Sequence, residues 1–100
     1  MAETLQVDPA ETRRVFFSTI VPGIREGAIL RLVGRSSTVF REIPPETRVE
    51  VRELTDTGLW VRRLTKAGTW ARRSSPEGIP PAWRIHLIEL SGWTLEGFAR

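Results

Sequence analysis

The sequence predicts a mainly β fold with a minor α component, namely a small SH3-like or OB-like antiparallel barrel preceded by one N-terminal helix. Apolar or alternating segments recur about every ten residues between residues 28 and 90, and turn-forming residues separate them. A helix-start signature precedes the first of these segments. Short strands with turn signals between them are typical of small barrels and sandwiches. One hundred residues suffice for one hydrophobic core, so we expect one domain over residues 1–100.

The predicted helix covers about residues 9–20. Asp8 can cap it, Pro9 suits the first helical position, and the Pro-Gly pair at 22–23 ends it. Its predicted apolar face consists of four residues at helical spacing, with Phe17 at the border: Val15, Phe16, Thr19 and Ile20. We expect this face to pack against one end of the barrel.

Apolar runs and alternation predict the strands. The near-continuous apolar run at 28–33 indicates a strand buried on both faces, and a second strand is expected at 38–43. Residues 48–54 alternate most clearly of all. A turn at 55–58 then leads into a return strand at 59–64.

A second turn, at 65–68, places Gly68 in the left-handed conformation and predicts another hairpin. Its register sets two cross-strand pairs: Leu64 with Trp70, and Arg62 with Arg72. One face of this hairpin then carries five residues: Trp60, Arg62, Leu64, Trp70 and Arg72. The other face carries four: Val61, Arg63, Ala71 and Arg73. A shift of one residue would reverse these assignments, because side chains alternate along a strand.

The rest of the chain predicts a loop at 74–81, a strand at 83–90 and a final helical turn at 93–100. That helical turn is expected to dock through three apolar residues: Trp93, Leu95 and Phe98. The predicted core comprises the apolar positions on the inward faces: Phe16, Ile20, Leu30, Leu32, Val49, Val51, Leu64, Ile85 and Leu87.

Composition excludes several classes of function. The chain has no cysteine and only one histidine, His86, so disulfides, a cysteine-ligated zinc and a histidine-rich metal site are excluded. No combination of residues meets the requirements of a catalytic site, so we predict no catalytic residue, no cofactor and no metal. Without an apolar run of about 18 residues or a signal pattern, we expect a soluble cytoplasmic protein with no membrane partner. The excess of Arg over Lys and the lack of Asn are typical of a thermophile or of a GC-rich genome.

One short stretch, residues 59–73, holds the basic character of the chain and is called the basic segment below. Its second half largely repeats its first, since Gly58-Leu59-Trp60-Val61-Arg62-Arg63 returns ten residues later as Gly68-Thr69-Trp70-Ala71-Arg72-Arg73. It contains five basic residues and no acidic one, whereas the rest of the chain has ten basic and twelve acidic residues. Arginine contacts phosphate in two-pronged fashion, and an exposed tryptophan stacks on bases. We therefore predict non-specific binding of nucleic acid, RNA or DNA, through seven residues: Trp60, Arg62, Arg63, Lys66, Trp70, Arg72 and Arg73.

The alternative is a protein–protein interaction module or regulatory subunit that docks by a Trp-rich or edge-strand surface. In that interpretation Trp60 and Trp70 are core residues, which the usual burial of tryptophan favours, and the arginines pair with glutamates. Burial of the two tryptophans therefore discriminates between the two functions. Two smaller features are the possible anion-binding loop at 34–38 and His86, which we interpret as a strand connection and a structural residue.

Overall fold

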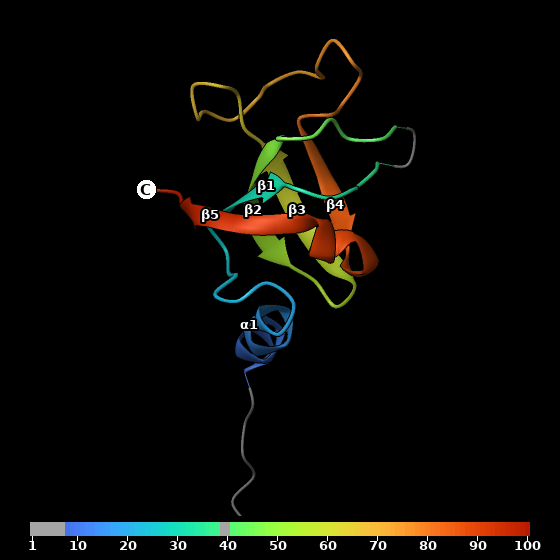
Figure 1. Ribbon diagram of the computed structural model, residues 1–100. Helices are drawn as coiled ribbons and strands as arrows, with labels where there is room; N and C mark the ends of the chain where they lie inside the picture. The colour runs from blue at the N-terminus through green and yellow to red at the C-terminus, as the bar shows by residue number, and fades with distance from the viewer. Residues whose placement is uncertain (1–7, 39–40) are drawn as a thin grey trace, which may run out of the picture.

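The computed structural model describes residues 8–38 and 41–100 of the chain (Figure 1). One helix, α1 (Pro9–Ser18), precedes all the strands. The strands are β1 (Ala28–Leu32), β2 (Arg48–Leu54), β3 (Gly58–Arg63), β4 (Ala82–His86) and β5 (Trp93–Phe98), and a 3₁₀ helix, η1 (Leu87–Gly92), joins the last two. The prediction of a mainly β fold with one N-terminal helix is confirmed.

All five strands belong to one antiparallel sheet in the order β4-β3-β2-β1-β5. Strands β1 to β4 pair in chain order, and β5 returns to pair with the other side of β1. Among the described residues no backbone pairing joins β4 to β5, so the sheet is open and the predicted closed barrel is wrong. The two edge strands meet only through side chains, since the rings of Trp83 and Trp93 lie with centroids 6.5 Å apart.

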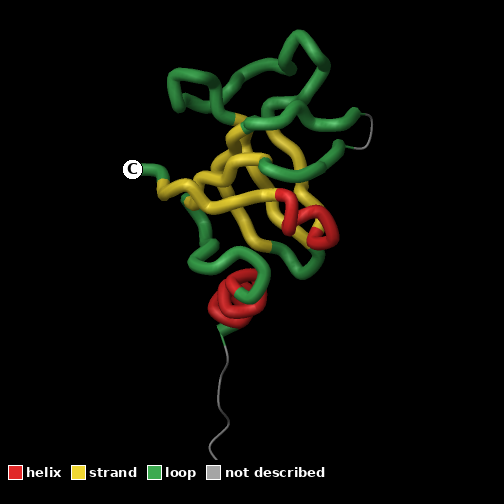
Figure 2. Tube along the Cα trace, viewed as in Figure 1, coloured by secondary structure: helices red, strands yellow, loops and turns green. Residues whose placement is uncertain are grey.

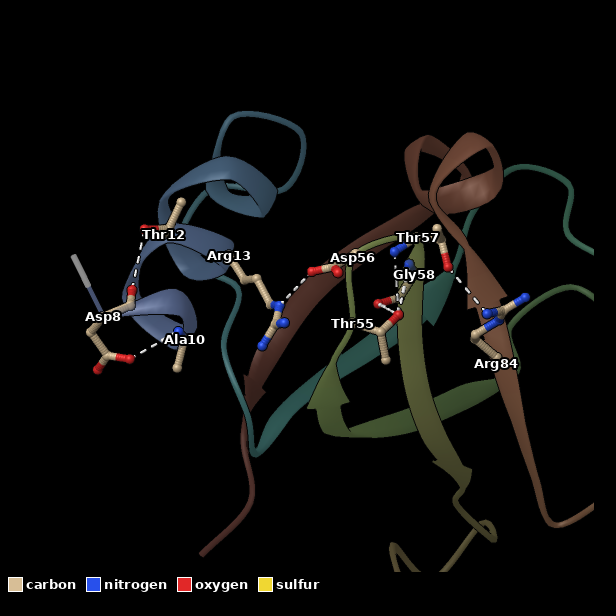
Figure 3. Close-up of polar contacts among 9 residues, drawn as sticks. All are labelled: Asp8, Ala10, Thr12, Arg13, Thr55, Asp56, Thr57, Gly58 and Arg84. Atoms are coloured by element: carbon tan, nitrogen blue, oxygen red, sulfur yellow. Dashed lines mark hydrogen bonds and ion pairs between the residues drawn. The ribbon is translucent and has the colours of Figure 1, made fainter. Parts of the chain in front are cut away.

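The helix begins as the sequence predicts but buries a different face. The Asp8 side chain accepts a hydrogen bond from the Ala10 amide at 3.0 Å (Figure 3), and Pro9 occupies the first turn. The buried stripe runs through Phe17, Val21 and Ile24, each at most 4% exposed. These positions are i, i+4 and i+7, so the stripe continues the helical spacing past the end of the helix and into the connection to β1.

Two core predictions fail for this reason. Phe16 is 48% exposed and Ile20 37% exposed, because each neighbours the buried stripe without belonging to it. The helix lies at the end of the sheet where β2 turns into β3, and Arg13 binds Asp56 of that turn at 2.9 Å (Figure 3). The other predicted core residues are buried, apart from Leu87, which is half-buried and packs against the core: Leu30, Leu32, Val49, Val51, Leu64 and Ile85.

Two element predictions also fail. Residues 38 and 41–43 form no strand, since the pairing there is limited to an isolated bridge between Ser37 and Glu42, and residues 39–40 lie outside the described part. The predicted helical turn at 93–100 is strand β5, because the open side of β1 supplies its backbone with hydrogen-bond partners. The predicted strand at 83–90 ends at His86, where η1 begins.

Candidate nucleic-acid interface

The basic segment begins on β3 and continues into the loop that follows it, and this loop lies at the end of the sheet opposite α1 (Figure 2). The predicted turn forms, because Gly68 has a φ of 82° and its amide donates to the Thr65 carbonyl at 2.9 Å. Leu64 and Trp70 are bridged as predicted. The predicted pairing of Arg62 with Arg72 is wrong, because β4 occupies that side of β3 and sets Ala82 opposite Arg62.

Trp60 lies on the outer face of the sheet. Its neighbours along β3, Leu59 and Val61, are at most 1% exposed, whereas Trp60 is 46% exposed. The strand register sets Glu53 of β2 on one side of it and Arg84 of β4 on the other. Within the described ranges the indole makes no hydrogen bond and no ring contact. The tryptophan therefore presents an open ring to solvent.

Trp70 is also exposed, to 40%, but its ring is engaged. Its Nε1 donates to Oε1 of Glu50 at 3.1 Å, which fixes the loop to the outer face of β2. The guanidinium carbons of Arg62 and Arg52 lie 4.3 and 4.7 Å from the ring centroid. Arg52 also donates to Oε2 of Glu50 at 2.6 Å, and Glu50 itself is 6% exposed. The interpretation of Trp60 and Trp70 as core residues is therefore wrong.

Arg63 points to the other side of the sheet and has a partly structural role. It is half-buried, and its Nη2 donates to the Arg73 carbonyl at 2.6 Å, which holds the loop in place. Its charge contributes to a lowered pKa at Glu77, after the larger effects of hydrogen bonds from the Glu77 backbone and the Ser75 hydroxyl. Lys66 and Arg63 also line an open pocket of about 490 Å³ at this end of the molecule.

The cations of the basic segment differ from most other arginines in their pairing. Six arginines elsewhere form ion pairs: Arg13, Arg14, Arg31, Arg35, Arg48 and Arg52. Neighbouring glutamates raise the pKa of two of them, Glu26 that of Arg14 and Glu46 that of Arg31, each chiefly by accepting a hydrogen bond. Within residues 8–38 and 41–100, no carboxylate forms an ion pair with Arg62, Arg63, Lys66, Arg72 or Arg73. Lys66, Arg72 and Arg73 are exposed.

An open groove of about 740 Å³ adjoins Trp60 on the side of β4. Its lining comes from five parts of the chain: β3, β4, η1, and the loops at 33–47 and 64–81. Arg84 lines this groove and Arg52 contacts Trp70, yet sequence reasoning selected neither. Alternation along β4 marks Arg84 as outward-facing. Its neighbour on β3 cannot be predicted in this way, because it depends on how the long loop between β3 and β4 sets the pairing of the two strands.

The possible anion-binding loop at 34–38 binds a carboxylate of the chain itself. The Ser36 and Ser37 hydroxyls donate to Glu89 of η1 at 3.0 and 2.9 Å, and the Ser37 amide donates at 3.2 Å. His86 accepts a hydrogen bond from the Ile88 amide at 3.3 Å, so its interpretation as a structural residue is supported by this contact. The contacts of Ser36 and Ser37 with Glu89 attach the loop at 34–38 to η1, so the donors of this loop already bind a carboxylate of the chain.

Two further kinds of site are not found in the described part of the chain. It contains no group of three or more acidic or histidine residues placed to hold a metal ion. None of its helices is long and apolar enough to cross a membrane. Comparisons with protein-family models, with curated proteins and with solved structures found no match to this chain.

Proposed function

We propose that this protein binds nucleic acid, with little base specificity, through the basic segment. The observation that carries the proposal is the absence of ion-pair partners for its five cations in the part of the chain that the structure describes. Phosphates of a polyanion would supply the missing partners. Arginine suits this role because its planar guanidinium matches two phosphate oxygens at once.

The five basic side chains have two kinds of role, according to where they lie. Lys66, Arg72 and Arg73 are exposed on the loop and contact phosphates directly. Arg62 is held against the Trp70 ring, and Arg63 against the Arg73 carbonyl, so these two set the shape of the surface as well as its charge. Contacts of this kind recognise the backbone of a nucleic acid and carry no base information.

Binding of labelled random-sequence oligonucleotides at several salt concentrations tests this proposal. The variant replaces Lys66, Arg72 and Arg73 with Gln, and the control replaces Arg25, Arg35 and Arg100, which are equally exposed. The first should weaken binding to every sequence. It should also flatten the salt dependence, by about 0.7 in log–log slope for each phosphate of a single strand that the variant no longer neutralises. The charge-matched control should retain most of the affinity and of the slope. Equal effects of the two triple variants, or no binding at low salt, would contradict the proposal.

A second candidate, a protein-interaction module, is favoured by the free edge of β4. The amides of Arg63 and Leu87 form hydrogen bonds at the two ends of the β3–β4 pairing. Because such bonds alternate along an antiparallel pair, the backbone groups of Arg84 point away from β3. An extended segment of a partner could add there as a sixth strand. Protection of the Arg84 amide from hydrogen exchange by a protein partner, together with an absence of oligonucleotide binding, would favour this function.

We also propose that the fold is SH3-like rather than OB-like. An OB fold follows a Greek-key path. Four consecutive strands pair in chain order here, and η1 leads the chain back so that β5 joins β1, which supports the SH3-like alternative. An experimental structure in which β4 pairs with β1 would contradict it.

A further inference from the structure

We infer that Trp60 is a stacking platform for one unpaired nucleobase, so that the ligand of this surface is a single-stranded nucleic acid. This inference rests on the proposed function, and it assigns different roles to two tryptophans that occupy equivalent places in the sequence repeat. Trp60 contacts the ligand. Trp70 positions the arginines.

The two tryptophan rings differ in what already covers them. Base stacking requires an accessible aromatic face. The Trp70 ring already has the guanidinium groups of Arg52 and Arg62 within 4.7 Å of its centroid. Trp60 is more exposed, and among the described residues nothing stacks on it. Of the two, only Trp60 offers its ring to a base.

Positive charge lies beside the Trp60 ring. Trp60 and Arg84 are directly opposite each other in a non-hydrogen-bonded pair, the arrangement in which side chains of neighbouring strands come closest. Arg84 donates to the Thr57 hydroxyl at 3.1 Å (Figure 3), and within the described part of the chain no carboxylate pairs with it. Arg62 follows Trp60 by two residues and faces the same side of the sheet. A base on Trp60 thus has cations beside it for the neighbouring phosphates.

The groove next to Trp60 has room for a base. Pro80, Ala82 and the 80% exposed Ile88 give it apolar walls, and its volume of about 740 Å³ is in the range of small-molecule sites. A flat, largely apolar base fits such a surface. In a duplex each base is paired and already stacked on its neighbours, so it reaches Trp60 only after leaving the helix, which is costly. A single strand offers the same base without that cost.

Glu53 determines on which side of the Trp60 ring the backbone of the ligand passes. It lies opposite Trp60 on the β2 side, is exposed, and forms no ion pair or hydrogen bond among the described residues. Its charge repels phosphate, so the backbone of the ligand passes on the Arg84 side of the ring. Glu53→Gln should therefore strengthen binding of a single strand.

The test measures binding of three ligands of equal length at low salt: a mixed-sequence single strand, the same sugar–phosphate chain without bases, and a duplex. Trp60→Ala should weaken binding of the single strand by about 5- to 150-fold, the range found for loss of a stacking aromatic, and leave the abasic chain unaffected. Trp60→Phe should retain most of the affinity. Phe16→Ala removes a similarly exposed ring from α1, outside the basic segment and the groove, and should change nothing.

The outcomes separate the inference from the proposed function. If Trp60→Ala leaves single-strand binding unchanged while binding remains salt-dependent, the stacking site is wrong, the basic segment keeps its role, and the groove is left for a polypeptide segment. Equal weakening with the single strand and the abasic chain would show that Trp60 only supports the basic segment. No binding of wild type to any ligand would overturn both. If Trp60→Ala fails to fold, Trp60→Phe settles the matter, because base-dependent quenching of tryptophan fluorescence must then fall relative to wild type.

Discussion

At the scale of single residues, Glu50 determines how the basic segment is held. Glu50 is 6% exposed and lies opposite Arg62 in the sheet. It accepts hydrogen bonds from the Trp70 indole and from Arg52, so a buried charge is satisfied by groups from a neighbouring loop and from its own strand. A buried carboxylate without such donors is costly. Glu50 therefore fastens the loop to the sheet.

Trp70→Ala should lower the free energy of unfolding by about 1–3 kcal/mol, since it leaves the buried Glu50 carboxylate without its indole donor. Trp60→Ala is the matched control, because the Trp60 indole makes no hydrogen bond among the described residues, and it should cost less. Denaturant unfolding of both variants measures the difference. Equal costs would show that the Glu50 contact does not stabilise the loop.

Leu30→Ala tests the core at its centre. Leu30 is fully buried on β1, between Val49 of β2 and Leu95 of β5. Its truncation should cost about 2–5 kcal/mol, the usual range for a packed leucine. Ile88→Ala, at an apolar residue that is 80% exposed, should stay within about 0.5 kcal/mol. A change below about 1 kcal/mol for Leu30→Ala would contradict the packing described above.

At the scale of elements, the sequence correctly predicted the features that depend only on residues close to one another in the chain. The Asp8 cap, the alternation at 48–54 and the left-handed Gly68 each specify their own element, and the structure has all three. Partners that are distant in the sequence decided the rest. Residues 93–98 become a strand only because β1 has a free side, and Arg62 faces Ala82 because β4 displaces the expected second strand of the hairpin.

The candidate site follows the same division. The charge and the two tryptophans can be read from the sequence. Their exposure cannot, because the strand register is needed to say which face of the sheet is outward. The repeat itself misleads, since its first copy lies in β3 and its second in a loop. Equivalent residues thus have different surroundings: Trp60 faces solvent and Trp70 contacts two arginines.

The stability of the loop that follows β3 should depend on pH through the carboxyl group of Glu77. Hydrogen bonds from the Glu77 backbone and the Ser75 hydroxyl, with the Arg63 charge as a smaller cause, hold the pKa of Glu77 below its usual value. A carboxyl group with a lowered pKa in the folded state stabilises the protein above its unfolded pKa, and this contribution disappears as the pH falls through the folded pKa.

The melting temperature of wild type should therefore exceed that of Glu77→Gln at neutral pH, and the difference should shrink below about pH 5. Ser75→Ala should reduce this pH dependence, because it removes one of the two hydrogen bonds. Thermal melts between about pH 7 and pH 3 measure it. A difference between wild type and Glu77→Gln that stays constant over this range would contradict the role assigned to Glu77.

At the scale of the whole molecule, the excess of positive charge is concentrated in one segment. The basic segment carries five positive charges and no negative one, whereas the rest of the chain has a small excess of acidic residues. Helix α1 lies at the opposite end of the sheet (Figure 1), where Arg13 and Arg14 are paired with carboxylates. Such a concentration of positive charge attracts a polyanion to this segment before contact. Helix α1 carries none of the residues of the proposed binding surface.

Titration of isotope-labelled protein with a mixed-sequence single strand, followed through its backbone amide signals, tests this account most directly. At low salt, the signals of residues 59–73 and of Arg84 should shift together, those of α1 should not, and added salt should reverse the shifts. A lack of shifts at low salt, or shifts centred on α1 or on the β5 edge, would contradict binding at the basic segment.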